Sequence, residues 1–66
     1  MKTYLVEYEK TASTRIKADG YRNKKGFINF YIEWPEEIDG EIVNFKDTLA
    51  SFKADSVVMI KLIHRD

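Results

Sequence analysis

Alternation of apolar and polar residues with a period of two is the feature of this 66-residue sequence that most restricts its fold. In the segment 27–34, the residues that would share one face are Ile28, Phe30, Ile32 and Trp34. The segment 2–9 repeats the pattern with Tyr4, Val6 and Tyr8. Successive side chains of a strand point to opposite faces, so this pattern predicts half-buried β-strands.

The same reasoning predicts two further strands and the breaks between them. Segment 13–22 is expected to be one strand, with Gly20 as a candidate bulge position. Residues 23–26 predict a tight turn, in which Gly26 supplies the positive φ. Segment 57–64 is apolar on both faces, which is typical of a central strand. Pro35 is expected to end the strand 27–34 because proline has no amide hydrogen, which leaves 36–40 as an acidic loop.

The segment 41–56 has two readings. Phe45, Leu49 and Phe52 follow the i, i+4, i+7 spacing of a helix, and Asn44 is a suitable N-cap. The alternative is a strand over 41–45, a second strand over 48–53 and a turn at 54–56. Periodicity does not distinguish a short helix from a short strand here.

Two stretches of the sequence resemble a pattern in small uncharacterised bacterial and phage proteins that are built as β-meanders. One stretch joins KADGYR at 17–22 to GFINFY at 26–31, and the other is ASFKADSVVMI at 50–60. The resemblance covers less than half of the chain. It implies strand, turn and strand in the second stretch, it is compatible with a phage or bacterial accessory protein, and it implies no activity.

These observations predict the fold class. We expect one small domain over 1–66, mainly β, with about five antiparallel strands in a meander or a partly closed barrel. The alternative is an α+β fold with one helix near 45–53. A chain of this length buries only about 60% of the surface that its unfolded form exposes, so the core must be small.

The net charge is zero, but the charges are segregated along the chain. Residues 10–25 contain six basic residues and one acidic residue, which gives +5, whereas residues 33–47 contain six acidic residues and one basic residue, which gives −5. The overall balance argues against indiscriminate binding to polyanions. Whether the two segments neutralise each other in the fold is not decided by the sequence.

Composition argues against most catalytic chemistry. The chain has no cysteine and one histidine, His64, so thiol catalysis, disulfides and cysteine-ligated metals are excluded. The carboxylates of 36–41 lack the spacing of a calcium loop and are read as a solvated loop. We therefore expect a protein that is not an enzyme and has no cofactor. The absence of disulfides favours a cytoplasmic location, and the longest apolar run, 57–60, is far too short to cross a membrane.

The strongest functional signal is a set of basic residues interleaved with aromatic ones. The candidate interaction residues are Arg15, Lys17, Tyr21, Arg22, Lys24, Lys25, Phe27, Tyr31 and Met59. The predicted function is a non-catalytic binding module that acts through a protein surface, with burial of Phe27, Tyr31 and Met59 and with a second copy of the chain as one partner. The alternative is binding of single-stranded nucleic acid, in which cations follow phosphates and rings stack on bases.

Overall fold

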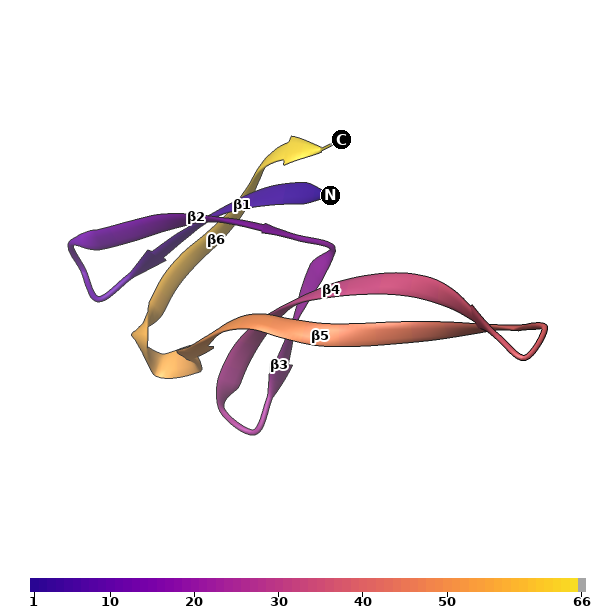
Figure 1. Cartoon of the computed structure of the whole chain (residues 1–66). Helices are drawn as coiled ribbons and strands as arrows, with labels where there is room; N and C mark the ends of the chain where they lie inside the picture. Colours follow the sequence, from indigo (N-terminus) through magenta and orange to yellow (C-terminus); the bar gives the residue numbers. More distant parts are fainter. Residues whose placement is uncertain (66) are drawn as a thin grey trace.

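A computed structural model describes residues 1–65 as six antiparallel β-strands in two three-stranded sheets (Figure 1). The strands are β1 (Lys2–Tyr8), β2 (Ala12–Ala18), β3 (Gly20–Lys24), β4 (Phe27–Ile38), β5 (Glu41–Lys53) and β6 (Val57–Arg65), with a 3-10 turn, η1 (Ala54–Ser56), before β6. Sheet I has the order β2-β1-β6, and sheet II has the order β3-β4-β5. The prediction of a mainly β domain is confirmed; the sheets do not close into a barrel. The helix near 45–53 is wrong, because those residues belong to β5.

Two hairpin turns follow directly from local backbone preferences. Lys25 and Gly26 both have positive φ, as do Asp39 and Gly40. Positive φ at both central residues defines the type I′ turn, whose twist matches that of the flanking strands. The predicted turn at 23–26 is therefore confirmed, with Lys25 and Gly26 as its centre.

The chain changes sheets at Asp19, where a single strand was expected over 13–22. The Asp19 amide donates to the Tyr31 carbonyl oxygen at 2.8 Å, and the Asp19 Oδ2 accepts from the Glu33 amide at 2.7 Å. Gly20 is buried there, and a Cβ at this position would lie 2.6 Å from the Tyr31 hydroxyl. Glycine is thus required by the close approach of the tyrosine ring rather than by a bulge.

A small core fills the space between the two sheets. Its buried members are Tyr4, Val6, Ala18 and Phe30, and the half-buried side chains around them include Tyr8, Ile16, Ile28, Phe52, Val57 and Ile60. The Phe30 ring contacts the rings of Tyr4, Tyr21 and Phe52, with centroids 5.3–6.0 Å apart. Burial is the main cause that raises the pKa of Tyr4 above its usual value.

The last strand is an edge strand, which corrects the expectation of a central one. β6 pairs only with β1, and β1 is the central strand of sheet I. Two register shifts interrupt the β1–β6 ladder, and Val58, the unpaired residue of one of them, is 65% exposed. The shift allows Val57 and Ile60 to face the same core although they are three residues apart.

Pro35 does not end its strand, which continues to Ile38. Backbone amides of a strand alternate in direction, and the Glu33 amide points away from β5 towards Asp19. The nitrogen of Pro35 therefore points the same way, to an edge that β3 no longer covers, and no ladder hydrogen bond is lost. Of the residues expected to form an acidic loop, 36–38 are the end of β4, and only Asp39 and Gly40 form a turn.

Candidate interaction surface

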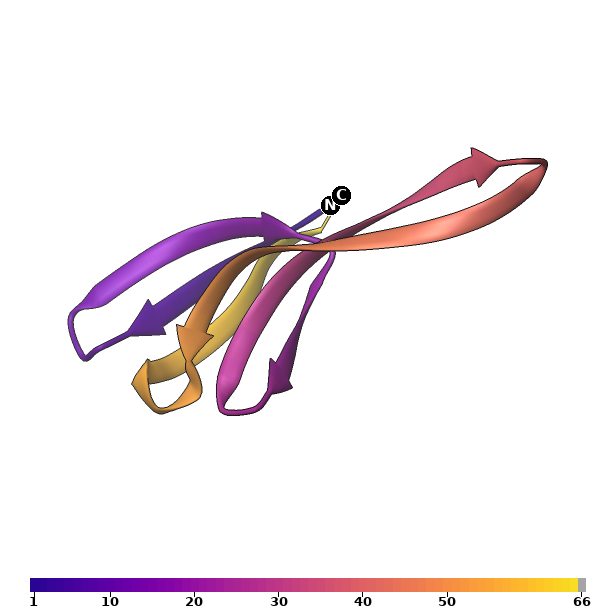
Figure 2. The same ribbon diagram turned by 60° about the horizontal axis from the view of Figure 1, so that its bottom comes forward.

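The distal halves of β4 and β5 form a two-stranded arm that extends beyond both sheets (Figure 1, Figure 2). We define the arm as residues 33–38 of β4 paired with 41–46 of β5. β4 and β5 have 12 and 13 residues, whereas β3 has 5, so the arm has no third strand. The arm accounts for much of the length of a molecule that measures 49 × 28 × 11 Å.

The inner face of the arm continues the row of side chains that forms the core. Cross-strand pairing places Trp34 opposite Phe45, Glu36 opposite Val43 and Ile38 opposite Glu41 on this face. The rings of Trp34 and Phe45 are stacked, with centroids 5.9 Å apart and planes 21° apart. The Trp34 Nε1 donates a hydrogen bond of 3.1 Å to the Glu36 Oε1, which fixes the indole in place.

The apolar side chains of this row are partly exposed, and Glu36 and Glu41 lie among them. Trp34, Val43 and Ile38 have exposed fractions of 36%, 37% and 44%. Over Phe30 the same row lies beneath sheet I, but sheet I does not extend over the arm (Figure 2). An open hollow of about 420 Å³ lies at the root of the arm and is lined by Lys2, Asp19, Glu33, Trp34, Pro35 and Asn44. The arm thus presents core-type side chains without the second layer that covers a core.

The outer face of sheet II carries a cluster around Tyr31. The Arg22 guanidinium carbon lies 5.6 Å from the centroid of the Tyr31 ring, and the Lys46 Nζ lies 4.3 Å from it. Lys46 also forms an ion pair with Glu33 at 3.1 Å. A shallow hollow of about 160 Å³ on this face is lined by Arg22, Lys24, Asn29, Tyr31, Lys46 and Thr48. These contacts show that alternate residues of the three strands share one surface.

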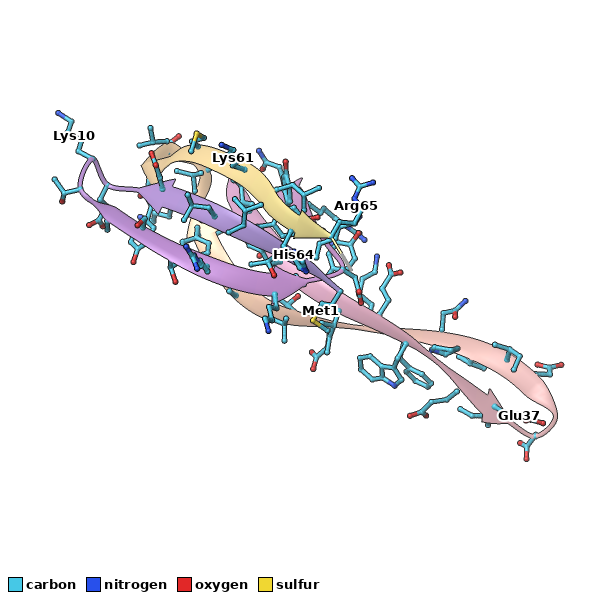
Figure 3. The ribbon with its side chains drawn as sticks, turned by 90° about the horizontal axis from the view of Figure 1, so that it is seen from above. Met1, Lys10, Glu37, Lys61, His64 and Arg65 are labelled. Atoms are coloured by element: carbon cyan, nitrogen blue, oxygen red, sulfur yellow. The ribbon has the colours of Figure 1, made fainter. Side chains whose placement is uncertain are left out.

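The opposite charges of the chain lie at separate ends of the molecule. The arm tip contains the carboxylates of Glu36, Glu37, Asp39 and Glu41. The β1–β2 turn lies at the other end of the molecule, and the β3–β4 turn lies at the bottom of the view in Figure 2. In Figure 3, Lys10 in the β1–β2 turn and Glu37 in the arm lie at the two extremes of the long axis. Lys10 and the acidic tip of the arm are therefore too far apart to neutralise each other within one chain.

The structure divides the sequence-predicted interaction residues among several surfaces. Arg15, Lys17 and Met59 pair with Leu5, Thr3 and Glu7 on the outer face of sheet I. The outer face of sheet II carries Arg22, Lys24, Phe27 and Tyr31, with Lys25 in the adjoining turn. Tyr21 is partly exposed at the rim of the core, where its ring contacts Tyr4 and Phe30.

The expectation that Phe27, Tyr31 and Met59 are buried together as one face is wrong in consequence. The strand of Arg15 and Lys17 does not neighbour the strand of Phe27 and Tyr31, because β2 and β4 belong to different sheets. For the same reason Met59 does not share a face with Phe27 and Tyr31. What the structure does bring together is Arg22, Lys24 and Tyr31, with Lys46 as an additional cation.

Sequence reasoning missed the inner face of the arm. Trp34 was assigned to a strand, but Pro35 was read as its end, so Ile38 and Val43 were not placed beside it. The signal was present in Asp39-Gly40, a dipeptide that is typical of the type I′ turn of a hairpin. Pro35 on an open edge is compatible with that reading.

Searches for other kinds of site gave negative results within residues 1–65. No group of three or more histidine, cysteine or acidic side chains in this range is arranged to hold a metal ion. The same residues contain no helix that is long and apolar enough to cross a membrane. Comparison of the chain with protein-family models, with curated proteins and with solved structures gave no match.

Proposed function

We propose that this protein is a non-catalytic binding module that acts through a protein surface, and that the arm is its binding element. The observation that carries the proposal is the exposed inner face, where Trp34, Val43 and Ile38 continue the core row without a covering layer. Removing apolar side chains of this size from water lowers the free energy of the system, so a partner that covers them is favoured. Aromatic residues are enriched at the centres of protein interfaces, and tryptophan is prominent among hot-spot residues.

The charges on the arm define the kind of partner that it fits. Glu36 and Glu41 lie on the inner face among the apolar residues, and Glu37 and Asp39 lie close to them at the tip. A partner segment that combines apolar side chains with lysine or arginine would pair with these carboxylates. An acidic segment would be repelled, which gives the arm selectivity and a faster encounter with basic partners. The proposal includes a cytoplasmic location, on the ground that the chain has no cysteine for disulfides.

The sole tryptophan of the chain provides a direct test of this function. A short peptide that alternates lysine and valine is titrated into the protein while the emission of Trp34 is recorded. We expect a shift of the emission to shorter wavelength as the peptide covers the indole. A matched peptide that alternates glutamate and valine should bind at least about tenfold more weakly, because it places like charges opposite the arm.

Two valine variants locate the contact. Val43→Lys replaces an apolar side chain on the inner face with a charge that repels the lysine peptide, and it should abolish the emission shift. Val58→Lys, at a more exposed valine on β6, should leave the shift intact. An unchanged Trp34 emission with the basic peptide, or an equal response to both peptides, would contradict the proposal.

A second candidate function is binding of single-stranded nucleic acid on the outer face of sheet II. The cations of Arg22, Lys24 and Lys46 line one hollow with Tyr31, and Phe27 is 44% exposed nearby on the same strand. Cations beside exposed rings are typical of surfaces that follow a phosphate backbone. The Tyr31 ring is already contacted by two cations, so Phe27 is the better stacking platform.

Titration of a labelled oligothymidylate at two salt concentrations tests this candidate. We expect binding at low salt that weakens steeply as salt is raised, because counterions are released from each neutralised phosphate. Lys24→Glu should reduce the affinity and the salt dependence together. Absence of binding at low salt would eliminate the candidate.

A further inference from the structure

The outer face of sheet II is a single long surface with opposite charges at its two ends. Along β4 this face carries Phe27, Asn29, Tyr31, Glu33, Pro35 and Glu37, and the paired residues of β5 include Lys53, Ser51, Thr48, Lys46, Asn44 and Ile42. Observed contacts tie the row together: Ser51 Oγ donates to Asn29 Oδ1 at 2.5 Å, and both Arg22 and Lys46 lie over the Tyr31 ring. The register of the β4–β5 ladder extends this side of the sheet from Phe27 to Glu37 in the arm.

One end of this face is basic and the other is acidic. The basic end has Arg22, Lys24 and Lys53 around Phe27, and residues 20–31 and 48–53 contain no acidic residue. At the centre, Glu33 and Lys46 form an ion pair and so cancel each other. The acidic end has Glu37 beside Ile42, with Asp39 in the adjoining turn. Asp55 in η1 is the nearest acidic residue in sequence to the basic end.

Each end of the face also carries an exposed apolar side chain. Ile42 is 68% exposed at the acidic end, which makes it the most exposed large apolar side chain of the described residues. Phe27 is 44% exposed at the basic end. Apolar side chains flanked by a single sign of charge need a partner that carries apolar groups with the opposite sign. The other end of the same face has that composition.

We propose that a second copy of the chain docks on this face, antiparallel to the first, across a two-fold axis near Tyr31 and Glu33. The arrangement places Glu37 and Ile42 of one copy against Lys24 and Phe27 of the other, and the same contact occurs twice. A self-complementary patch of this kind gives an isologous interface that closes at the dimer. The inner face of the arm is not used, so it stays open for the partner described under the proposed function.

The inner face of the arm is a poorer candidate for the same role. Glu36 and Glu41 lie there, and the inner face carries no basic side chain between residues 34 and 45 to oppose them in a second copy. Two inner faces would therefore bring carboxylates together. The outer face of sheet II contains both members of each charge pair, and this difference assigns self-association to the outer face.

Light scattering after size-exclusion chromatography tests the proposal with two charge-reversal variants. The wild-type chain should have twice the 7.8 kDa mass of one copy and dissociate on dilution. Glu37→Lys and Lys24→Glu should each weaken association by at least about tenfold, because each variant opposes like charges at both repeats of the contact. Both residues are exposed, and circular dichroism checks that each variant stays folded.

An equimolar mixture of the two variants gives the decisive result. In the mixed dimer, lysine at position 37 meets glutamate at position 24 in one contact, and the native pair is present in the other. We expect the mixture to recover the dimer that neither variant forms alone, which a folding defect would not produce. A wild-type monomer up to about 1 mM, an assembly larger than a dimer, or a mixture that stays monomeric would overturn the proposal. A monomer whose Trp34 still responds to the basic peptide would retain the proposed function and lose only this inference.

Discussion

Replacing Phe30 with alanine is expected to lower the free energy of unfolding by about 3–5 kcal/mol. Phe30 is fully buried, and its ring contacts three other aromatic rings from β1, β3 and β5. The substitution removes a large apolar group and leaves a cavity that the surrounding rings cannot fill without moving. A chain of this length has a total stability of about 3–10 kcal/mol, so much of the population should unfold at 25 °C.

Urea denaturation followed by far-ultraviolet circular dichroism measures the effect. Trp34 fluorescence is unsuitable here, because the indole lies on the arm and not in the core. Phe27→Ala, compared at a protein concentration too low for the proposed dimer to form, is the matched control: it makes the same chemical change on the same strand, at a side chain that is 44% exposed. It should cost less than about 1.5 kcal/mol. Equal losses for both variants would contradict the assigned core.

Gly20→Ala is expected to destabilise the protein by about 1–3 kcal/mol, although alanine ordinarily stabilises a strand interior relative to glycine. The added Cβ would lie 2.6 Å from the Tyr31 hydroxyl oxygen and 2.9 Å from the Cζ of the ring. The ring has little freedom to retreat, because Arg22 and Lys46 both lie over it. The clash falls where the chain passes from sheet I to sheet II, so it disturbs the junction of both.

A double-mutant cycle with Tyr31→Ala separates this clash from a general effect of alanine. Without the tyrosine ring, the space at Gly20 is open and the same Gly20→Ala change should be neutral or stabilising. The coupling energy between the two positions is then about the whole cost of the single substitution. An additive cycle, measured by urea denaturation, would show that the ring is not the cause.

The strands of this fold could be predicted from alternation, but the bulges could not. Phe45 and Phe52 are an odd number of residues apart, which in a regular strand puts them on opposite faces. A register shift between Phe30 and Tyr31 leaves Leu49 without a partner on β4 and returns both rings to the inner side. The spacing of seven that resembled a helix is thus the signature of a bulged strand. A register shift at Val58 likewise changes which residues of β6 face the core, so alternation alone could not identify them.

The division into two sheets could not be read from residue patterns either. The alternation of Ile16 and Ala18 with charged residues breaks at Asp19-Gly20, but this local signal does not show that the chain crosses to a second sheet there. Tertiary contacts determine where the chain crosses between the sheets. They are the hydrogen bonds of Asp19 to Tyr31 and Glu33 and the packing of Tyr31 on Gly20. A pattern confined to one segment contains no information about a contact with another.

The candidate surface was only partly accessible from the sequence. The opposite charges of 10–25 and 33–47 were evident, and so was the basic and aromatic cluster of Arg22, Lys24 and Tyr31. Their separation along the molecule depends on the length of β4 and β5, which was hidden by the reading of Pro35 as a terminator. Trp34, which was expected on the core face of a strand, is instead an exposed residue of the arm.

The central position of β1 determines the order in which the molecule can assemble. The β1–β2 hairpin and the β3–β4–β5 meander are local and can form as soon as each segment is made. Sheet I is complete only when Val6 pairs with Ile60, near the other end of the sequence, and closing so long a loop is slow. During synthesis on the ribosome, Tyr4 and Val6 must therefore stay unpaired with β6 until residues 57–65 have emerged. Until β6 is available, the apolar face of the β1–β2 hairpin is exposed, and chaperones would encounter the chain in this incomplete form.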